Sequence, residues 1–516
     1  MPERWHDCER CGNLNLSMVL AVPNPRPKPQ KKQHGLAFWM QRVLEECDRA
    51  SADFAPDPVH DLRVALRRCR SMADGLMAMD PDPAWKKMKK AGKNLFSRLG
   101  ELRDLQVMQE WVQKLGAADD PVTAELLQFT SFREAEFKRQ SAQALQAFDR
   151  NQWKKWSREL PRRAARVRTG SAIFRHLALE RWTEAYALHR RALRSGSQIA
   201  WHRLRIGIKR FRYIVENFLP AQHEQWIEDL KTLQDLLGEV HDLDVLWATA
   251  LQINVFHDPA SRSVWHARIL DERNHRIQSY RHKAMGRDSL WQRWRAELPA
   301  GHQVEACALA RLKLWASFLD PDFKHSVHVA HLAVELYDSL PLKKCADSER
   351  REERAILHLA ALLHDVGLSK KEKAHHKTSY RLIQKLHPLL GCSEEKLRLA
   401  GVVARYHCGA LPRTGQKPLI RLAPAQRQLT VKLAGILRLA NAFDADRSGR
   451  IQRLELHEEG RILVIRAQGY KSRTRTAEDV AAARHLLETV LCRPIMTKPL
   501  IVRKPRTQAR ARGMAA

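Results

Sequence analysis

The sequence predicts a mainly all-α protein in which a pseudo-two-fold pair of duplicated helical bundles precedes a second helical domain with a small α+β appendage. Three observations support this class. Apolar residues recur at helical spacing from about residue 36 to 298, interrupted only at proline- and glycine-containing stretches. Two segments of the first half reappear in the second half in the same order. Near the C-terminus, apolar and polar residues alternate as in a β-hairpin.

The composition favours a cytoplasmic protein with an anionic partner. The 516 residues include 90 Lys and Arg against 58 Asp and Glu, a formal net charge of +32. Such a charge attracts nucleic acid, an anionic membrane surface or inorganic polyphosphate. No apolar run approaches the roughly 18 residues that span a bilayer, so no membrane segment is expected. The 9 cysteines are scattered and no signal peptide is evident, which predicts a reducing compartment.

The two ends of the chain are predicted to lie outside the folded domains. Residues 1–35 are rich in Pro and Lys, which predicts a disordered basic segment. Cys8 and Cys11 form a CxxC in this segment, a weak zinc signal without a second ligand pair. Residues 505–516 read as a basic tail.

Two predicted helices carry the same pattern of cationic side chains. Val59–Met72 reads VHDLRVALRRCRSM and Trp201–Phe218 reads WHRLRIGIKRFRYIVENF. In each, a histidine and three cations follow at steps of three, four and three residues, which places them within an arc of roughly 80° on one helix face. These two sets are called the first and second basic stripes: His60, Arg63, Arg67 and Arg70; and His202, Arg205, Lys209 and Arg212.

A second pair of matched segments indicates an internal duplication. Leu99–Met108 reads LGELRDLQVM, and Leu237–Leu246 reads LGEVHDLDVL. The order and separation predict one helical domain over residues 36–298, with repeats at about 36–150 and 172–290. A duplicated fold explains the apolar positions but does not by itself require repeated cations. The alternative is that the stripes are ordinary solvated faces, yet such faces commonly interleave acids at i,i+4, and the stripes show no such acids.

A further lysine cluster distinguishes the two halves. Lys86, Lys90 and Lys93 are predicted to fall on one helical side. The corresponding stretch of the second half, WIEDLKTLQDLLG, is mildly acidic. The first half is therefore expected to bind an anion more strongly.

The paired stripe helices and the paired Leu-Gly-Glu-x-x-Asp-Leu segments resemble the CHAD family, the conserved histidine α-helical domains. The resemblance implies a helical fold with internal two-fold pseudosymmetry and a basic surface that binds inorganic polyphosphate through the eight stripe residues. The lysine cluster is added to this predicted site because of its charge alone. Guanidinium groups suit this ligand because they engage phosphate oxygens bidentately. A site for bases would be expected to add aromatic stacking surfaces, and the stripe arcs contain none, which favours polyphosphate over nucleic acid.

A separate histidine series marks the C-terminal part. His364 and Asp365 end an apolar helix just before Gly367, and His325 lies about forty residues earlier. Histidine nitrogens and an aspartate oxygen from such positions can converge on one cation. His376 and His407 follow in the same order along the chain.

The segments AALLHDVG, HHKTSYRLI and VARYHCGALPR resemble the HD superfamily of metal-dependent phosphohydrolases, and more narrowly the C-terminal domain of the exopolyphosphatase/guanosine-pentaphosphate phosphatase family. The resemblance implies an HD-type domain over residues 303–448 and a divalent metal, Mn or Mg, held by His325, His364 and Asp365. His376 and His407 become candidates for a second metal or a phosphate contact. No catalytic residue is assigned.

Two departures from that family bear on activity. Asn441 stands where the family has its final aspartate, and Asp444 one turn later is a possible substitute. Thr378 stands where the family has a histidine. Because asparagine is a neutral donor and a poorer ligand than a carboxylate, the site either binds metal weakly or retains only phosphate affinity.

Residues 449–504 are predicted to form the small α+β appendage. A hairpin is expected around Glu459–Gly460, a helix over 477–491 and a strand over 498–504. Taken together, the sequence predicts a polyphosphate-binding protein whose HD domain hydrolyses or senses a phosphorylated ligand. The alternatives are a non-enzymatic protein of polyphosphate granules with a degenerate HD domain and, less favoured, a nucleic-acid-binding protein.

Overall fold

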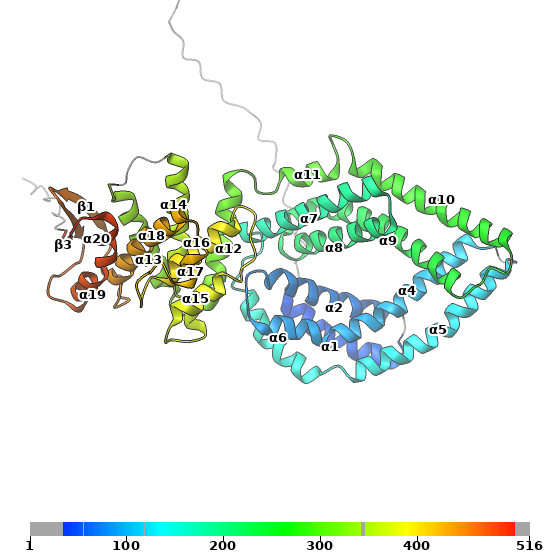
Figure 1. The fold of residues 1–516 in the computed structure, drawn as a ribbon. Helices are drawn as coiled ribbons and strands as arrows, with labels where there is room; N and C mark the ends of the chain where they lie inside the picture. Colours follow the sequence, from blue (N-terminus) through cyan, green and yellow to red (C-terminus); the bar gives the residue numbers. More distant parts are fainter. Residues whose placement is uncertain (1–34, 55, 118, 342–345, 501–516) are drawn as a thin grey trace, which may run out of the picture.

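The computed structural model describes residues 35–500 except 55, 118 and 342–345 (Figure 1). It is mainly helical, with a three-stranded sheet near the C-terminus, which confirms the predicted fold class. Cys8, Cys11 and the predicted tail at 505–516 lie outside the described residues, as does almost all of the predicted N-terminal segment. Within the described part, no helix is both long enough and apolar enough to cross a membrane.

The N-terminal bundle contains two successive sets of helices. The first set comprises α1 (Leu36–Asp53), α2 (Pro56–Leu76), α3 (Pro83–Ala91), α4 (Lys93–Leu115), α5 (Pro121–Gln146) and α6 (Arg150–Ala164). The second set comprises α7 (Ala172–Ser195), α8 (Gln198–Phe218), α9 (Pro220–Gln252), α10 (Pro259–Ala284) and α11 (Leu290–Ala296). Several helices begin at an Asp or Ser whose side chain accepts a hydrogen bond from a backbone N–H of the first turn. In α3, α5 and α10 a proline also lies in the first turn.

The two stripe helices, α2 and α8, pack against each other. A Cβ atom at Gly75 of α2 would lie 2.4 Å from the Phe218 ring of α8, so only glycine allows this approach. Arg68 of α2 donates to Glu216 of α8 at 2.5 Å and to Asn217 at 3.2 Å. The two helices that the sequence predicts to be equivalent in the repeats are therefore in direct contact.

The two halves also meet at the far end of the bundle. There α4 and α5 approach α9 and α10 (Figure 1), and a small separate core includes Trp111 and Trp265. The main core of the bundle lies beneath the stripe helices and their neighbours. The stripe helices α2 and α8 therefore lie between the main core and this small core.

The C-terminal domain has its own hydrophobic core. Its helices are α12 (His302–Leu319), α13 (Phe323–Ser339), α14 (Asp347–Leu363), the 3₁₀ helix η1 (Val366–Ser369), α15 (His375–Ile383), α16 (Glu394–Arg405), α17 (Lys417–Ile420) and α18 (Pro424–Phe443). The appendage follows with β1 (Leu454–Glu459), β2 (Ile462–Ala467), α19 (Arg475–Ala483), α20 (His485–Leu491) and β3 (Ile495–Pro499).

The appendage agrees with its prediction except near its end. The strands β1 and β2 pair antiparallel around Glu459–Gly460, which confirms the hairpin. The strand β3 pairs parallel with β2 and spans 495–499, so it begins earlier than the predicted strand at 498–504. The helix expected over 477–491 is divided into α19 and α20.

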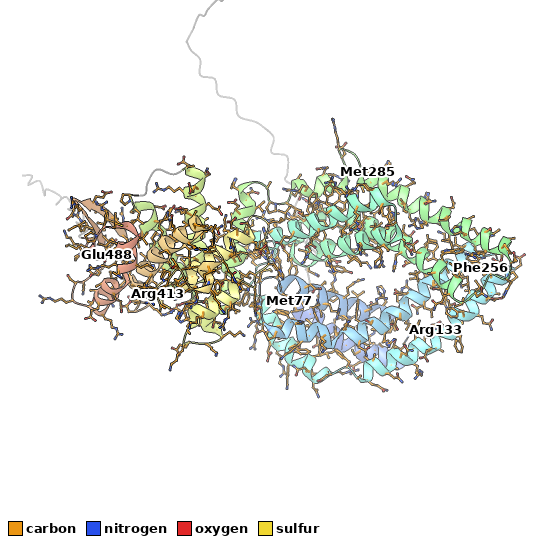
Figure 2. The ribbon with its side chains drawn as sticks, viewed as in Figure 1. Met77, Arg133, Phe256, Met285, Arg413 and Glu488 are labelled. Carbon is orange, nitrogen blue, oxygen red and sulfur yellow. The ribbon has the colours of Figure 1, made fainter. Side chains whose placement is uncertain are left out.

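A polar interface joins the bundle to the C-terminal domain. Buried Arg311 of α12 contacts Glu180 of α7 at 2.5 Å, and His176 Nε2 donates to the Leu390 carbonyl at 2.8 Å. Met77, at the end of the α2 region, lies at this junction (Figure 2) and lines a cavity of about 710 Å³ there. Because α12 also packs on η1, the interface lies next to the helix end that carries His364 and Asp365.

Candidate functional sites

The two basic stripes face each other across the contact between α2 and α8. The pKa of Lys209 is lowered to about 8 by burial and by the positive charges of Arg205 on its own helix and Arg63 and Arg67 on α2. Charges on two helices can act on one ammonium group only if they are close to it. We call these four residues, Arg63, Arg67, Arg205 and Lys209, the basic cluster.

Most of the charge in the basic cluster is not neutralised within the protein. Among the described residues, Arg67, Arg205 and Lys209 form no ion pair with a carboxylate. Arg205 Nε is buried without a hydrogen-bond partner. Unpaired, half-buried cations are costly unless a ligand meets them, so the arrangement suits an anion.

Acidic partners do occur at the margins of the stripes. Arg63 lies 3.6 Å from Asp104 of α4, and Arg212 lies 3.8 Å from Glu216, four residues later on α8. Asp74, four residues after Arg70, likewise raises the pKa of that guanidinium against the lowering effect of burial. The expectation that the stripes lack acids at i,i+4 is therefore wrong at their C-terminal ends, although Arg67, Arg205 and Lys209 form no ion pair with a described carboxylate.

The two matched Leu-Gly-Glu segments, one in each half of the bundle, each place an aspartate beside the stripes. Asp104 of α4 and its repeat equivalent Asp242 of α9 both act electrostatically on the basic cluster. Burial raises the pKa of Asp242 to about 6, while Arg205 opposes that rise. The second repeated motif therefore contributes side chains to the same surface as the stripes.

The histidine of the second stripe, His202, has a lowered pKa and so is not an additional cation at neutral pH. His202 Nδ1 lies 3.3 Å from His241 Nδ1 of α9. Burial, Arg205 and Lys209 lower the pKa of His202, and burial and Arg205 lower that of His241 to about 4. His60 is exposed. His241 was not predicted as a site residue, although its place in the repeated motif was a signal for it.

The lysine cluster is split between two helices. Lys86 and Lys90 are exposed on α3, whereas Lys93 begins α4 after the junction at Gly92. The three lysines therefore do not share one helix face as predicted. Phe96, one turn into α4, lies under two stripe guanidiniums, with Arg70 at 5.2 Å and Arg63 at 5.8 Å from its ring centre. This aromatic ring is thus already engaged by the protein's own cations.

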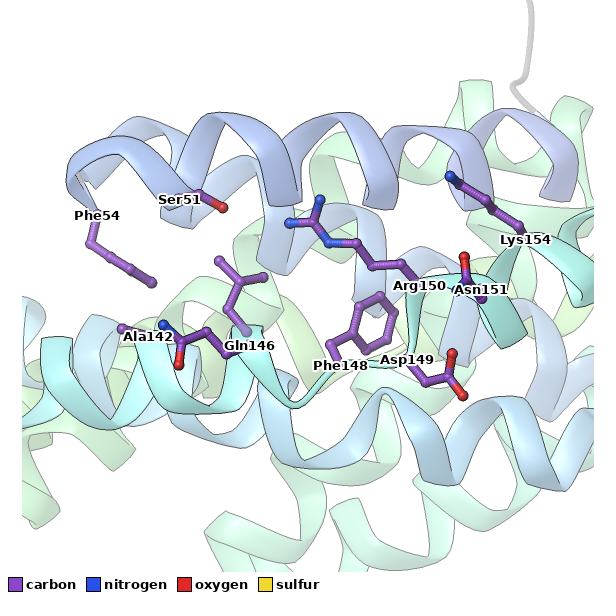
Figure 3. Close-up of a pocket in the computed structure, with 10 residues that line it drawn as sticks. Ser51, Phe54, Ala142, Gln146, Phe148, Asp149, Arg150, Asn151 and Lys154 are labelled. Carbon is purple, nitrogen blue, oxygen red and sulfur yellow. The ribbon is translucent and has the colours of Figure 1, made fainter.

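A cavity of about 570 Å³ lies between α1, α5 and α6, and its lining includes no stripe residue (Figure 3). Its lining mixes apolar side chains such as Phe54 and Phe148 with Arg150 and Lys154. Arg150 is paired with Asp48 at 2.5 Å. Because this pairing neutralises one of its cations, the cavity is a poorer anion site than the basic cluster.

The C-terminal domain gathers its histidines at the ends of several helices. His325 lies in the first turn of α13, His364 and Asp365 follow α14, His375 begins α15, and His407 follows α16. A Cβ atom at Gly367 would lie 2.2 Å from the His375 carbonyl oxygen, so glycine is required for η1 to pack on α15. That close packing brings His375 to Asp365.

Three of these histidines are held in the same orientation. The Nδ1 atoms of His364, His407 and His375 lie 2.6, 2.8 and 3.1 Å from the backbone carbonyl three residues earlier. Because a carbonyl can only accept, each Nδ1 carries a proton, and each Nε2 is turned toward the interior of the cluster. This is the arrangement that orients metal-ligating histidines in proteins.

The three Nε2 atoms converge on one oxygen of Asp365. Oδ1 of Asp365 lies 3.3 Å from Nε2 of His375 and 3.6 Å from Nε2 of both His364 and His407. His364 Nε2 is buried without a hydrogen-bond partner. Lone pairs and a carboxylate that face one another require a positive charge between them.

Two groups of side chains in the described residues have the spacing to hold such a cation. One comprises His325, His364 and Asp365, all buried. The other comprises His375, His407 and Cys408. His376, predicted to lie in the site, is not in either group; its ring centre lies 6.4 Å from that of His407. His375 and Cys408 were not predicted, although their adjacency to His376 and His407 in the sequence was a signal.

Asn441 and Asp444 occupy different positions around His325. Asp444 Oδ2 lies 2.7 Å from His325 Nδ1, and its Oδ1 accepts the Gly449 N–H at 2.8 Å. Asn441 Oδ1 instead lies 3.1 Å from His325 Nε2, the atom on the metal-binding side of the ring. Both oxygens of Asp444 are thus engaged in orienting the site, whereas Asn441 stands beside the ligand atom.

Positive side chains surround this histidine cluster. Arg447, whose backbone is left-handed at φ 56°, donates to Asp365 Oδ2 at 2.6 Å and to Asp322 at 3.1 Å. Burial, Arg405 and other nearby cations lower the pKa of His376 to about 4. One guanidinium nitrogen of Arg405, Nη1, is buried without a hydrogen-bond partner. Such surroundings favour a phosphate-bearing ligand.

The protonation states follow from these contacts. Burial alone would raise the pKa of Asp365, but His364, His375 and Arg447 hold it well below its usual range. Hydrogen bonds to Asp365 and Cys408 raise the pKa of His375 to about 10, so a proton on His375 can supply the charge that the cluster requires. The carboxylate is therefore ionised, as a metal ligand must be.

Comparisons with known proteins agree with this division of the chain. A family model described as the CHAD domain matches residues 38–251, and one described as Ppx/GppA phosphatase, domain III, matches residues 313–488. A crystal structure of the CHAD domain from the plant Ricinus communis is 21% identical, with a TM-score of 0.36, and the match covers 51% of this chain and 88% of that one. No curated protein matches the chain significantly. The chain carries a CHAD domain in its N-terminal half and a Ppx/GppA phosphatase domain III in its C-terminal region.

Proposed function

We propose that the protein binds inorganic polyphosphate in the cytoplasm through the CHAD domain and that its C-terminal domain is a metal-dependent phosphohydrolase. The observation that carries the first part is the basic cluster. Its Arg67, Arg205 and Lys209, from two facing helices, form no ion pair with a carboxylate of the described residues, although Asp242 acts on Arg205 and Lys209 electrostatically. A linear phosphate polymer offers only charge and acceptor oxygens, which these cations can meet repeatedly along its length. We place the contacts at both stripes and, on the first half, at the lysine cluster.

Lys209 provides a pH-dependent signature of this binding. Its pKa is about 8 in the free protein, and a phosphate beside it would favour the charged form and raise that pKa. We therefore expect binding at pH 8 to take up about half a proton, and affinity to fall as the pH rises above about 8. Calorimetry with polyphosphate in buffers of different ionisation enthalpy measures the uptake.

Lys209→Arg is the matched control for this signature, because it keeps the positive charge but does not titrate in this range. The variant should bind with much less proton uptake than the wild type. If wild type and variant take up the same number of protons, Lys209 does not contact the ligand.

The second part of the proposal rests on the convergence of His364, His407 and His375 on Asp365. His325, His364 and Asp365 fit a divalent cation, since the Nε2 of His364 is buried, unpartnered and fixed by its backbone contact. Asn441 adds a neutral oxygen at the same place. A bound divalent ion would supply a water of lowered pKa and would polarise a phosphoryl oxygen.

The chain's own residues have separate tasks in this proposal. Asp444 orients His325 through Nδ1, and the backbone carbonyls orient the other histidines. We assign phosphate binding to Arg447, which donates to Asp365, and to Arg405, whose Nη1 is buried without a hydrogen-bond partner. His375 is placed to hold a proton beside the reacting group.

The alternative is a non-enzymatic polyphosphate-binding protein of polyphosphate granules, in which the C-terminal domain only senses a phosphate ligand. The neutral Asn441 favours this reading, because it weakens the site for a hard cation. A phosphate-release assay on the full chain, with long-chain polyphosphate or guanosine polyphosphates and Mn²⁺ or Mg²⁺, distinguishes the two. The proposal predicts that phosphate is released. If phosphate is released from neither substrate, the non-enzymatic binding protein is the better account.

A further inference from the structure

We infer that His176 and Arg311, two buried side chains at the junction of the two domains, are positioning residues for the histidine cluster of the C-terminal domain. They act through the loop at 384–393, which joins α15 to α16. The consequence for catalysis rests on the proposed phosphohydrolase function, whereas the contacts that carry the inference lie outside the histidine cluster.

The loop at 384–393 packs into two hydrophobic cores at once. Leu386 and Leu389 pack against the core of the C-terminal domain, whereas Leu390 packs against the main core of the bundle. The backbones of Leu389 and Cys392 exchange two hydrogen bonds, at 3.2 and 2.9 Å, which close the loop into a tight turn. Because its side chains interdigitate with both cores, the loop links the position of one domain to that of the other.

His176 and Arg311 hold this loop through a chain of hydrogen bonds. His176 of α7 is fully buried, and its Nε2 donates to the Leu390 carbonyl at 2.8 Å. Burial lowers the pKa of His176, so at neutral pH the ring has one proton and its Nδ1 is an acceptor. Arg311 of α12 donates to that Nδ1 at 3.4 Å and to Glu180 of α7 at 2.5 Å. Neutral His176 therefore connects the loop backbone to an ion pair between α7 and α12.

Gly391 brings the same loop onto the first turn of α12. Its backbone is left-handed at φ 80°, and a Cβ atom there would lie 2.9 Å from the backbone nitrogen of Glu305. Any other residue would be strained and would push the loop away. The loop is thus fixed both to α7 and to α12, the helix that carries Arg311.

The helices on either side of the loop carry two histidines of the cluster at their other ends. His375 begins α15 and His407 follows α16, whereas the loop joins the end of α15 to the start of α16. The two helices pack closely, since a Cβ atom at Gly401 of α16 would lie 3.1 Å from the Ile383 side chain of α15. A loop held at one end of this helix pair therefore fixes the histidines at the other end, about 13 Å away along α15.

Backbone hydrogen exchange of the full chain tests this positioning, because it reports on the loop and on the cluster separately. In His176→Ala, residues 384–393 and the stretch 403–408 around His407 should both exchange more than about 10-fold faster than in the wild type, since the loop loses a buried contact. Mn²⁺ affinity should fall by about 10-fold, the low end of the cost of losing an orienting partner. His176→Gln keeps a donor for the Leu390 carbonyl and should recover most of both.

The matched control is His189→Ala. His189 is also a buried histidine of α7, but its hydrogen bond, at 2.7 Å, is to Tyr280 inside the bundle. This variant should keep wild-type exchange in both stretches and wild-type Mn²⁺ affinity, even if the bundle becomes less stable. If His176→Ala does not fold, Gly391→Ala disturbs the same contact from the loop side and should give the same changes.

Failure of the positioning and failure of the proposed phosphohydrolase are distinguishable. A wild-type chain that binds no Mn²⁺ and releases no phosphate would end the phosphohydrolase proposal, while hydrogen exchange would still decide whether the junction orders the stretch around His407. Wild-type exchange around His407 in both His176→Ala and Gly391→Ala would overturn the positioning. So would equal effects of His176→Gln and His176→Ala, or the same changes in His189→Ala.

Discussion

The double change His364→Ala and Asp365→Ala is expected to abolish phosphate release and divalent-metal binding while leaving polyphosphate capture intact. Asp365 is the carboxylate on which three histidine Nε2 atoms converge, and His364 is fixed by its contact with the Ala361 carbonyl. Losing both removes two of the three donors of the first group. We expect metal affinity to fall by more than about 100-fold. Loss of a residue that only hydrogen-bonds to a metal ligand costs less than this.

The matched control removes one histidine and one acid from an exposed face of the same domain. His331 and Asp338 of α13 serve this purpose, and His331→Ala/Asp338→Ala should retain metal binding and phosphate release. Calorimetry with Mn²⁺ and a phosphate-release assay measure both variants. Because the basic cluster lies in the other domain, the affinity for polyphosphate should match the wild type in each. Unchanged metal binding in the His364/Asp365 variant would show that the histidine cluster is structural.

The second large effect is expected from reversing charge within the basic cluster. Arg205→Glu with Lys209→Glu replaces two unpaired cations by anions beside Arg63 and Arg67. A hydrogen bond to a charged group contributes about 1.5–3 kcal/mol, so losing two should weaken polyphosphate binding at least about 100-fold. Both positions lie off the apolar face of α8, so the bundle should remain folded, as circular dichroism can verify.

The same helix offers a control of equal charge. Arg203 and Arg210 are exposed on the opposite side of α8, and reversing both changes the net charge by the same amount. Screening limits the effect of such distant charges, so this variant should lose less than about 10-fold in affinity. Equal losses in the two double variants would mean that net charge alone, and not the basic cluster, determines binding.

The sequence predicted the repeated features of the molecule because periodicity and duplication are local patterns. The equal spacing of the stripes indicated one helix face each, and the structure brings Arg63 and Arg67 close to Lys209 as a duplicated fold allows. The hairpin at Glu459–Gly460 followed in the same way from alternation and a turn glycine with φ 63°. These elements depend on residues near in the sequence, which is why they could be predicted.

The missed residues depend on contacts between distant segments. Asp104 and His241 reach the stripes from α4 and α9, and no spacing within the stripe helices could indicate them. Arg447 reaches Asp365 through a left-handed backbone that a non-glycine residue seldom adopts. Cys408 becomes a candidate ligand only because the fold brings His375, at the start of α15, to 3.7 Å from its sulfur.

The roles of neighbouring candidates also required the fold. His375 and His376 are adjacent in the sequence, yet only His375 turns its Nε2 toward Asp365. Asn441 and Asp444 are one helical turn apart, and they contact opposite nitrogens of His325. A histidine or acid that the sequence predicts to be a metal ligand can therefore instead be the residue that orients a ligand.

The most direct test of the central claim is competition for the basic cluster between long-chain polyphosphate and single-stranded RNA of matched charge. Both are titrated into the full chain in the same buffer and at the same salt concentration, since affinities for polyanions depend strongly on salt. The basic cluster meets phosphate with guanidinium and ammonium groups, and Phe96 is already covered by two arginines of the first stripe, Arg63 and Arg70. We therefore predict that polyphosphate displaces RNA at a phosphate concentration at least about 10-fold lower than RNA needs to displace polyphosphate, a difference of about 1.4 kcal/mol. RNA that competes equally well or better would contradict the account.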